Sequence, residues 1–159
     1  MNVKAIESER YQDYKLPSMF VAFPKCSFKC EKEYGQQVCH NNTLATTPTF
    51  NIEIDYIINM YLSNPITSAV ILGGLEPFDS FDDMVDLIKT LRTTYCCDDM
   101  FVIYTGYTEN ELGTQLNILR QYKNIIIKFG RFIPNKTKHY DKLLGVWLAS
   151  DNQYAVQIS

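Results

Sequence analysis

Three cysteines carry the strongest chemical signal in this sequence. Cys26, Cys30 and Cys39 are three of the chain's five cysteines, and they fall within fourteen residues in the spacing C-x3-C-x8-C. A cubane iron–sulfur cluster normally takes four cysteine ligands, so three would leave one iron without a protein ligand. An open coordination position is typical of a catalytic metal site rather than a structural one. The trio therefore predicts a catalytic metal centre.

A second signal is the run Gly73-Gly74-Leu75-Glu76-Pro77, which directly follows the apolar residues 69–72. Glycines here permit a tight turn and a close approach of the backbone to a ligand. Glu76 offers a carboxylate that suits an ammonium group, and Pro77 fixes the backbone behind it. Taken alone, this pattern more often marks a plain turn between a strand and a helix.

The cysteines and the Gly-Gly run lie in a sequence that alternates predicted strands and helices, and these elements would position them. Residues 19–23, 69–72, 101–104 and 125–127 are short apolar runs, as expected of buried parallel strands. Apolar residues at helical spacing predict helices that cover 54–62, 81–91 and 108–119, and two further strands are predicted at 143–148 and 154–158. Repeated strand–helix units of this kind predict an α/β fold, a mostly parallel sheet with helices outside.

Helix starts and loops can also be read from the sequence. Ser80 with Asp83, and Thr108 with Glu111, are predicted caps at the start of two helices. Residues 36–49 are polar and predict a surface loop. Residues 128–142 predict an irregular basic segment, and Trp147 is expected in the core. Cys96 and Cys97, between a helix and a strand, are expected to be incidental thiols.

In parallel sheets ligands bind at the carboxyl ends of the strands. The cysteine loop, the Gly-Gly turn and Thr105-Gly106 all follow predicted strands, so one site can gather them.

Length and composition narrow the class of protein. The chain has 159 residues, which predicts one domain over 1–159 with a sizeable core. A net charge of −3 gives no broad basic footprint for nucleic acid. No apolar run approaches the roughly 20 residues of a membrane span, and the first residues lack the apolar core of a signal peptide. We expect a cytoplasmic, reducing location, where clustered cysteines more often indicate metal or redox chemistry than disulfides.

Together, the three cysteines and the Gly-Gly-x-Glu-Pro run resemble the radical S-adenosylmethionine (SAM) enzymes. The resemblance implies a partial (β/α)6-type barrel in which Cys26, Cys30 and Cys39 bind a [4Fe–4S] cluster. In that superfamily the fourth iron chelates the amino and carboxylate groups of SAM, and the Gly-Gly-Glu-Pro motif helps to hold its ammonium. The cluster then donates one electron, a carbon–sulfur bond of the sulfonium breaks, and a deoxyadenosyl radical forms. Gly73, Gly74, Glu76 and Pro77 are the matching residues here.

A narrower resemblance is to the activating enzymes of anaerobic ribonucleoside-triphosphate reductase. Cys39-His40-Asn41 looks like the end of their cysteine motif, and residues 102–107 are similar to their strand ending in Tyr-Thr-Gly-Tyr. Residues 129–132 resemble their Asp-Gly-Arg-Phe segment, and residues 149–153 resemble their Gly-Ser-x-Asn-Gln ending. The resemblance implies that His40, Asn41 and Tyr104 line the cofactor site.

The sequence departs from the family pattern in three places. The usual spacing is C-x3-C-x2-C, so six extra residues separate Cys30 from Cys39, and ligation is kept if residues 31–38 loop outward. The aromatic residue that often packs on the adenine is Val38 here, and an aliphatic side chain can still pack there. Phe129 replaces the family's Asp, so a hydrogen bond from that Asp is not expected.

The resemblance implies an activase that installs a glycyl radical on a partner anaerobic ribonucleotide reductase and takes its electron from a flavodoxin- or ferredoxin-type donor. Two alternatives stay open. One is a radical SAM enzyme that acts on a small molecule, similar to the 7-carboxy-7-deazaguanine synthases. The other is a non-catalytic zinc module that uses the three cysteines and His40, although adjacent Cys39 and His40 would reach one tetrahedral ion with difficulty.

Overall fold

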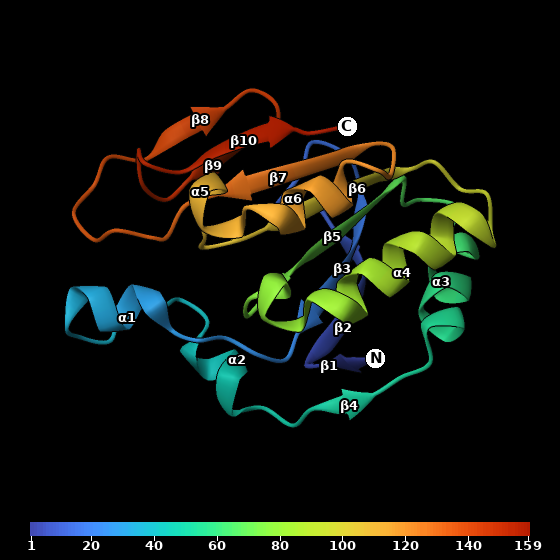
Figure 1. The fold of residues 1–159 in the computed structure, drawn as a ribbon, viewed down its shortest axis with the longest axis horizontal. Coiled ribbons are helices and arrows are strands. Elements are labelled where there is room, and N and C mark those ends of the chain that lie inside the picture. The colour runs from blue at the N-terminus through green and yellow to red at the C-terminus, as the bar shows by residue number, and fades with distance from the viewer.

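A six-stranded sheet forms the centre of the computed structural model, which describes residues 1–159 (Figure 1). Its strand order is β10-β7-β6-β5-β3-β2. The four inner strands, β3 (Ser18–Phe23), β5 (Ala69–Gly74), β6 (Met100–Tyr104) and β7 (Ile125–Phe129), are parallel. The edge strands β2 (Ala5–Arg10) and β10 (Tyr154–Gln157) are antiparallel to their neighbours. The predicted α/β class is confirmed, and this mainly parallel sheet is consistent with a partial barrel.

The remaining elements flank this sheet. Two small antiparallel pairs, β1 with β4 and β8 with β9, lie outside it. The bounds of the remaining elements are β1 (Asn2–Val3), α1 (Lys29–Tyr34), α2 (Asn42–Thr46), β4 (Phe50–Asn51), α3 (Ile54–Leu62), the 3-10 turn η1 (Pro77–Ser80), α4 (Phe81–Thr93), α5 (Glu109–Leu112), α6 (Thr114–Leu119), β8 (His139–Asp141) and β9 (Val146–Leu148).

The two faces of the sheet are covered differently, because successive residues of a strand point to opposite faces. On one face, side chains such as Val21, Leu72 and Ile103 join a buried cluster of 22 residues together with helices α3 to α6. On the other face, Phe20 and Ile71 belong to a smaller cluster of nine residues. Helices α3, α4 and α6 lie in front of the sheet, whereas α1 and α2 lie apart from that layer (Figure 1). Residues of this second face, Phe20 and Ala22 among them, line the cavity that is described below.

Several predictions about single elements need correction. The predicted strand 143–148 is shorter, because β9 comprises only Val146–Leu148 and pairs with β8, which lies inside the segment expected to be irregular. Trp147 is 69% exposed rather than in the core. Leu148 is buried, so Trp147, which precedes it in the strand, points to the opposite side. There the Trp147 ring contacts the Tyr140 ring, with centroids 5.8 Å apart. The polar stretch 36–49 is not loop throughout, because it contains α2.

The two predicted helix caps have different outcomes. Thr108 and Glu111 form a complete capping box at the start of α5, as predicted. Ser80 does precede α4, but its side chain makes no capping hydrogen bond. The chain enters α4 directly from η1, and this turn replaces the extended entry that a capping serine requires. None of the helices combines the length and the apolar character that a bilayer-spanning helix needs.

Candidate functional site

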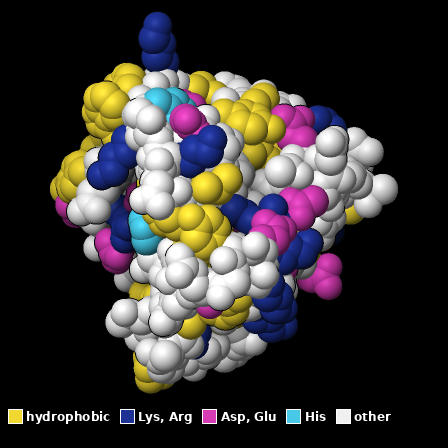
Figure 2. Space-filling model, turned by 90° about the vertical axis from the view of Figure 1, so that its left-hand side faces the viewer, with side chains coloured by type: hydrophobic (Ala, Val, Ile, Leu, Met, Phe, Trp, Pro, Cys, Tyr) yellow, Lys and Arg dark blue, Asp and Glu magenta, His cyan; other side chains and the backbone are white.

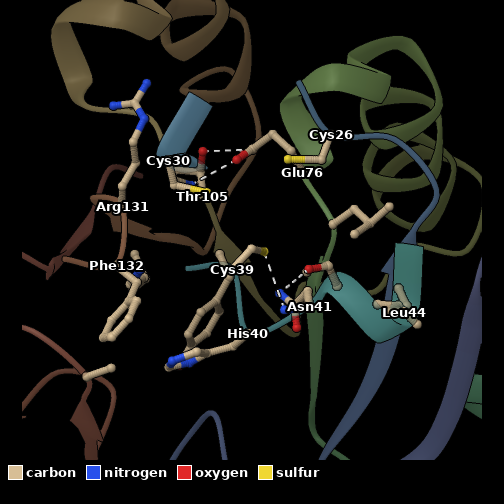
Figure 3. Close-up of a pocket in the computed structure, with 18 of the residues that line it drawn as sticks. Cys26, Cys30, Cys39, His40, Asn41, Leu44, Glu76, Thr105, Arg131 and Phe132 are labelled. Carbon is tan, nitrogen blue, oxygen red and sulfur yellow. Dashed lines mark hydrogen bonds between the residues drawn. The ribbon is translucent and has the colours of Figure 1, made fainter. Parts of the chain in front are cut away.

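The parallel strands end at a cavity of about 560 Å³. This volume lies within the range of roughly 300–1,000 Å³ that is typical of small-molecule sites. The cavity is lined by residues 24–49, here called the cysteine segment, by the Gly-Gly turn after β5, by the ends of β6 and β7, and by residues 148–153 (Figure 3). The carboxyl ends of the strands therefore form the site, as the topology predicts.

All three predicted cluster ligands line this cavity. Cys26 lies in the loop after β3, Cys30 lies in α1, and Cys39 lies between α1 and α2. Their thiols are free and half-buried. The backbone amides of Phe28 and Asn41 donate to the sulfurs of Cys26 and Cys39 at 3.3 and 3.4 Å. Hydrogen bonds of this kind favour the thiolate form, which is the form that binds iron.

Two of the thiols, those of Cys26 and Cys30, sit in an environment that favours the protonated form when no metal is bound. Burial raises the pKa of the Cys26 thiol to about 12, and the nearby charges of Glu76 and Asp79 act in the same direction. Burial and the nearby Cys39 also raise the pKa of Cys30. Metal ligands must be deprotonated, so loading a cluster here releases protons. The three free thiols line one cavity, and this donor set would suit an iron–sulfur cluster, whose iron atoms are held by cysteine thiolates.

Asp79, which sequence reasoning missed, holds the loop between the first two cysteines. One carboxylate oxygen accepts a hydrogen bond from the Ser27 amide at 2.6 Å, and the other accepts from the Tyr107 hydroxyl at 2.6 Å. The Tyr107 hydroxyl also lies 3.2 Å from the Ser27 hydroxyl. We call these three residues the Asp79 clamp. It ties the cysteine segment to the turn before α4 and to the loop after β6.

Glu31 organises the longer gap between Cys30 and Cys39. Its Oε1 accepts hydrogen bonds from the Cys39 amide at 3.3 Å and from the Asn42 side chain at 2.7 Å. Part of the gap is helical, because α1 continues to Tyr34, and α1 has no buried residue. The extra residues therefore extend outward, as expected, and Glu31 closes the excursion so that Cys39 returns to the cavity.

Ion pairs attach α1 to the body of the protein. Arg131 binds both carboxylate oxygens of Glu111, at 2.9 and 2.5 Å, and lies 3.5 Å from Glu33 of α1. Lys29, at the start of α1, lies 3.4 Å from Glu111. The space-filling view onto the carboxyl ends of the strands shows acidic, basic and hydrophobic side chains interspersed (Figure 2). This face therefore carries no large patch of one charge, and Arg131 forms ion pairs with individual neighbours, Glu111 and Glu33.

The Gly-Gly turn brings the backbone close to β3. Gly74 has a φ of +84°, and a Cβ at this position would lie 2.8 Å from the Cα of Ala22. A residue without a side chain is therefore required here. The carbonyl of Gly74 accepts a hydrogen bond from the Asn41 side chain at 2.6 Å. Asn41 thus links the cysteine segment to the Gly-Gly turn.

Glu76 is a buried carboxylate that is held in a fixed orientation. It is 6% exposed, and it accepts hydrogen bonds from the Phe78 amide at 3.2 Å, the Thr105 hydroxyl at 2.8 Å and the Gly106 amide at 2.9 Å (Figure 3). Burial raises its pKa to about 7, while these three donors oppose the rise. An ionised carboxylate has about four acceptor positions, so one remains for a cationic ligand.

Two side chains of the inner strands complete the wall. Tyr104, at the end of β6, was predicted to line the site and does so, but its hydroxyl donates to the Asp13 carbonyl at 2.6 Å. Lys128 of β7 also lines the cavity and was not predicted as a site residue. A lysine inside the apolar strand Ile125–Phe129 is the signal that could have found it.

Comparison with known families decides the class of this site. The sequence model described as the 4Fe-4S single cluster domain matches residues 17–155, a range that includes all three cysteines and Glu76. The chain belongs to this family. Comparisons with curated proteins and with solved structures give no match. The 4Fe-4S single cluster domain is characteristic of radical SAM enzymes, among them glycyl-radical activases, and supports the predicted [4Fe–4S] cluster.

Of the remaining predicted site residues in this 4Fe-4S single cluster domain, some line the cavity and one does not. Val38 and His40 line the cavity, whereas Pro77 is buried behind Glu76 as the first residue of η1. The His40 ring packs against Phe132, with centroids 4.2 Å apart (Figure 3). No three or more His, Cys, Asp and Glu side chains gather closely enough to hold a single metal ion, so the geometry offers no zinc site with His40. The ligand role of each cysteine stays a prediction.

Proposed function

We propose that this protein is a radical SAM activase that installs a glycyl radical on a partner enzyme, an anaerobic ribonucleotide reductase. The observation that carries the proposal is that three free thiols and the oriented carboxylate of Glu76 open onto one cavity. The thiols suit a [4Fe–4S] cluster, and the remaining acceptor position of Glu76 suits the ammonium group of SAM.

When bound, the reduced cluster supplies one electron that splits SAM into methionine and a deoxyadenosyl radical. Such a radical would be able to take a hydrogen atom from a glycine Cα of the partner, which would give deoxyadenosine and leave the unpaired electron on the glycine. An external one-electron donor of the flavodoxin or ferredoxin type balances each turnover. The protein itself orients SAM and keeps water away from the reacting atoms.

The choice of an activase rests on segments that lie far apart in the sequence but share the cavity. Cys39-His40-Asn41, residues 104–107, Arg131-Phe132 and Gln153 all line it, and each belongs to a motif that resembles the reductase activases. Short motifs that matched by chance would not be expected to meet in one cavity. Their common location therefore supports a shared role. The motifs therefore favour a partner protein over a small-molecule substrate.

The decisive experiment mixes the reconstituted, reduced protein with SAM and an anaerobic ribonucleotide reductase under exclusion of oxygen. We expect stoichiometric deoxyadenosine and the doublet of a glycyl radical in the electron paramagnetic resonance spectrum of the reductase. Deoxyadenosine without a glycyl radical would favour the small-molecule alternative. A colourless protein that holds one zinc ion after anaerobic purification would refute the radical SAM assignment altogether.

One variant and a matched control test the role of Glu76 in this reaction. Glu76→Gln should weaken SAM binding while the cluster stays in place, because the amide cannot neutralise an ammonium group. Asp82→Asn is the matched control, since Asp82 is an exposed acid in the first turn of α4. Equal SAM affinity in the two variants would contradict the role of Glu76.

A further inference from the structure

The hairpin of β8 and β9 exposes two aromatic side chains, here called the aromatic patch. Tyr140 and Trp147 lie directly opposite each other in the two strands and are 49% and 69% exposed. Their rings meet edge to face, with centroids 5.8 Å apart. Neither residue belongs to a core cluster. Burial within this chain therefore does not account for the aromatic patch.

The hairpin that carries the aromatic patch is fixed to the body of the protein. The Asp141 carboxylate accepts hydrogen bonds from the amides of Leu143 and Leu144, both at 2.9 Å, and from the Ala155 amide of β10 at 3.1 Å. Leu144 is fully buried, and its carbonyl accepts a hydrogen bond from the Lys15 amide at 2.7 Å. The exposed rings thus have a rigid support, and a partner that binds them does not have to order a loop first.

The charges that flank the aromatic patch are mainly positive. Lys136 and Lys138 lie just before β8, Lys142 directly follows it, and all three are exposed. No ion pair engages Lys138 or Lys142. Asp141 uses its oxygens on backbone amides, and Asp151 lies 3.6 Å from Lys136. Free lysines beside exposed aromatic rings suit a partner protein whose surface is acidic.

The aromatic patch lies on the outer side of a strand that borders the cavity. Leu148 is buried and lines the cavity, and Trp147 precedes it in β9, so the two side chains point to opposite sides of this strand. A partner on the aromatic patch therefore lies beside the cavity wall without entering the cavity. A reductase has to reach into the cavity with its glycine, whereas a partner that delivers an electron does not.

The aromatic patch is also small. Two buried aromatic side chains contribute about 150–250 Å² each, well below the roughly 800 Å² that each partner buries in a standard stable interface. Electron-transfer complexes, which form and separate at each turnover, lie at the low end of interface size.

We propose that the aromatic patch and its flanking lysines bind the acidic surface of the external electron donor. This assignment rests on the proposed function, which requires such a donor. One electron passes from the donor, which is oxidised, to the cluster, which is reduced, and the oxidised donor then leaves. The lysines attract the donor over a distance, and the small apolar centre orients it and allows its release.

The test uses the cluster-loaded protein with an acidic flavodoxin as the probe. Titration calorimetry at low ionic strength measures the affinity, and stopped-flow absorbance measures the rate of cluster reduction by the flavodoxin hydroquinone. Dithionite, a small reductant that needs no docking surface, serves as the reference. Trp147→Ala removes the apolar centre, and Lys138→Glu reverses one charge. The matched controls are Tyr56→Ala, at a 61% exposed aromatic residue of α3, and Lys89→Glu, at an exposed lysine of α4.

We expect Trp147→Ala to lower both the affinity for flavodoxin and the reduction rate constant about tenfold or more, as for the central residue of an interface. Lys138→Glu should also slow the reduction, and its deficit should shrink as the ionic strength rises, because salt screens exposed charges. With dithionite, both variants should be reduced and should cleave SAM as the controls do.

An unchanged affinity and rate of Trp147→Ala with flavodoxin would overturn the proposal. So would a Trp147→Ala variant that loses binding of the reductase alone, or a dimer of the unmutated chain that this substitution dissociates. Thermal unfolding verifies each fold, and if Trp147→Ala does not fold, an unchanged rate of Lys138→Glu at low ionic strength would overturn the proposal. Failure of the dithionite-reduced, unmutated protein to cleave SAM would instead overturn the proposed function, whatever its affinity for flavodoxin.

Discussion

The cysteine segment and the helix layer are stabilised in opposite ways. Helix α4 buries Met84, Leu87, Ile88 and Leu91 against the sheet, whereas α1 and α2 bury no residue at all. The helix layer is therefore held by apolar area removed from water. The cysteine segment is held by single polar contacts that the body of the protein provides, such as those from Asp79, Gly74 and Glu111.

The difference separates stability from function within one chain. A segment with few buried apolar contacts contributes little to the free energy of unfolding and is free to adapt to a ligand. The rigid layer can keep the carboxyl ends of its strands in place while the cysteine segment is completed by the group that binds there. Substitutions in the two regions should accordingly affect different measurements.

Cys39→Ala should give the largest effect on function and nearly none on the fold. Loss of one of three ligands should remove the cluster, so iron, sulfide and SAM cleavage should fall to background. The free energy of unfolding of the iron-free protein should stay within about 0.5 kcal/mol of the unmutated protein, because the side chain lies outside the core clusters. Cys96→Ala is the matched control, since Cys96 is an exposed free thiol. Normal SAM cleavage by Cys39→Ala would refute the ligand assignment.

Leu87→Ala should show the reverse pattern. Leu87 is 2% exposed within the main core cluster, and removing a buried leucine side chain typically costs about 2–5 kcal/mol. Urea unfolding measures this loss, and Leu62→Ala, at an exposed leucine of α3, should change stability by less than about 0.5 kcal/mol. The folded fraction of Leu87→Ala should still bind iron in the same ratio. A parallel loss of iron would mean that the two regions are not separable.

The same contrast explains how far the sequence predicts the structure. The inner strands and helices α3 and α4 were predicted because continuous apolar runs and helical periodicity reflect burial directly. The edge strand β2 was missed, since Ala5–Arg10 is mostly polar and pairs on one side only. Helix α1 was missed for a similar reason, because no apolar face marks it.

For the site, the sequence predicts which residues face the cavity better than it predicts what supports them. The cysteines, Gly73, Gly74 and Glu76 were predicted and all line the cavity. Asp79 was missed, because its partners lie 52 and 28 residues away and no local pattern reveals such contacts. The prediction that the Ser80 side chain caps α4 was wrong, because η1 leads directly into α4. Long-range polar contacts are thus the part of the site that requires the structure.

The Asp79 clamp tests how strongly the two regions are coupled. Asp79→Asn and Tyr107→Phe each remove a hydrogen bond at 2.6 Å, which should cost about 1–2 kcal/mol. We expect the cluster to load, but with faster iron loss to a chelator and altered g values in its electron paramagnetic resonance spectrum, because Ser27 directly follows Cys26. Asp82→Asn, the exposed neighbour on α4, should leave both readouts unchanged. Identical spectra for Asp79→Asn and the control would show that the clamp does not position the cysteine loop.

The smallest expected effect is the pH dependence of the ion pair between Glu111 and Arg131. The hydrogen bonds from Arg131 lower the pKa of Glu111 to about 2, from an ordinary value of 4.5. A carboxylate with a lowered pKa stabilises the folded state above pH 4.5, and this contribution is lost as the pH falls towards 2. Because the pair is partly exposed, Glu111→Gln should cost only about 1 kcal/mol at pH 7, measured by urea unfolding. The deficit relative to the unmutated protein should shrink between pH 4.5 and 2, while Glu53→Gln, at an exposed glutamate, should show neither change. A deficit that stays constant down to pH 2 would mean that Glu111 stabilises the protein through its capping of α5 and not through the charge that attaches α1.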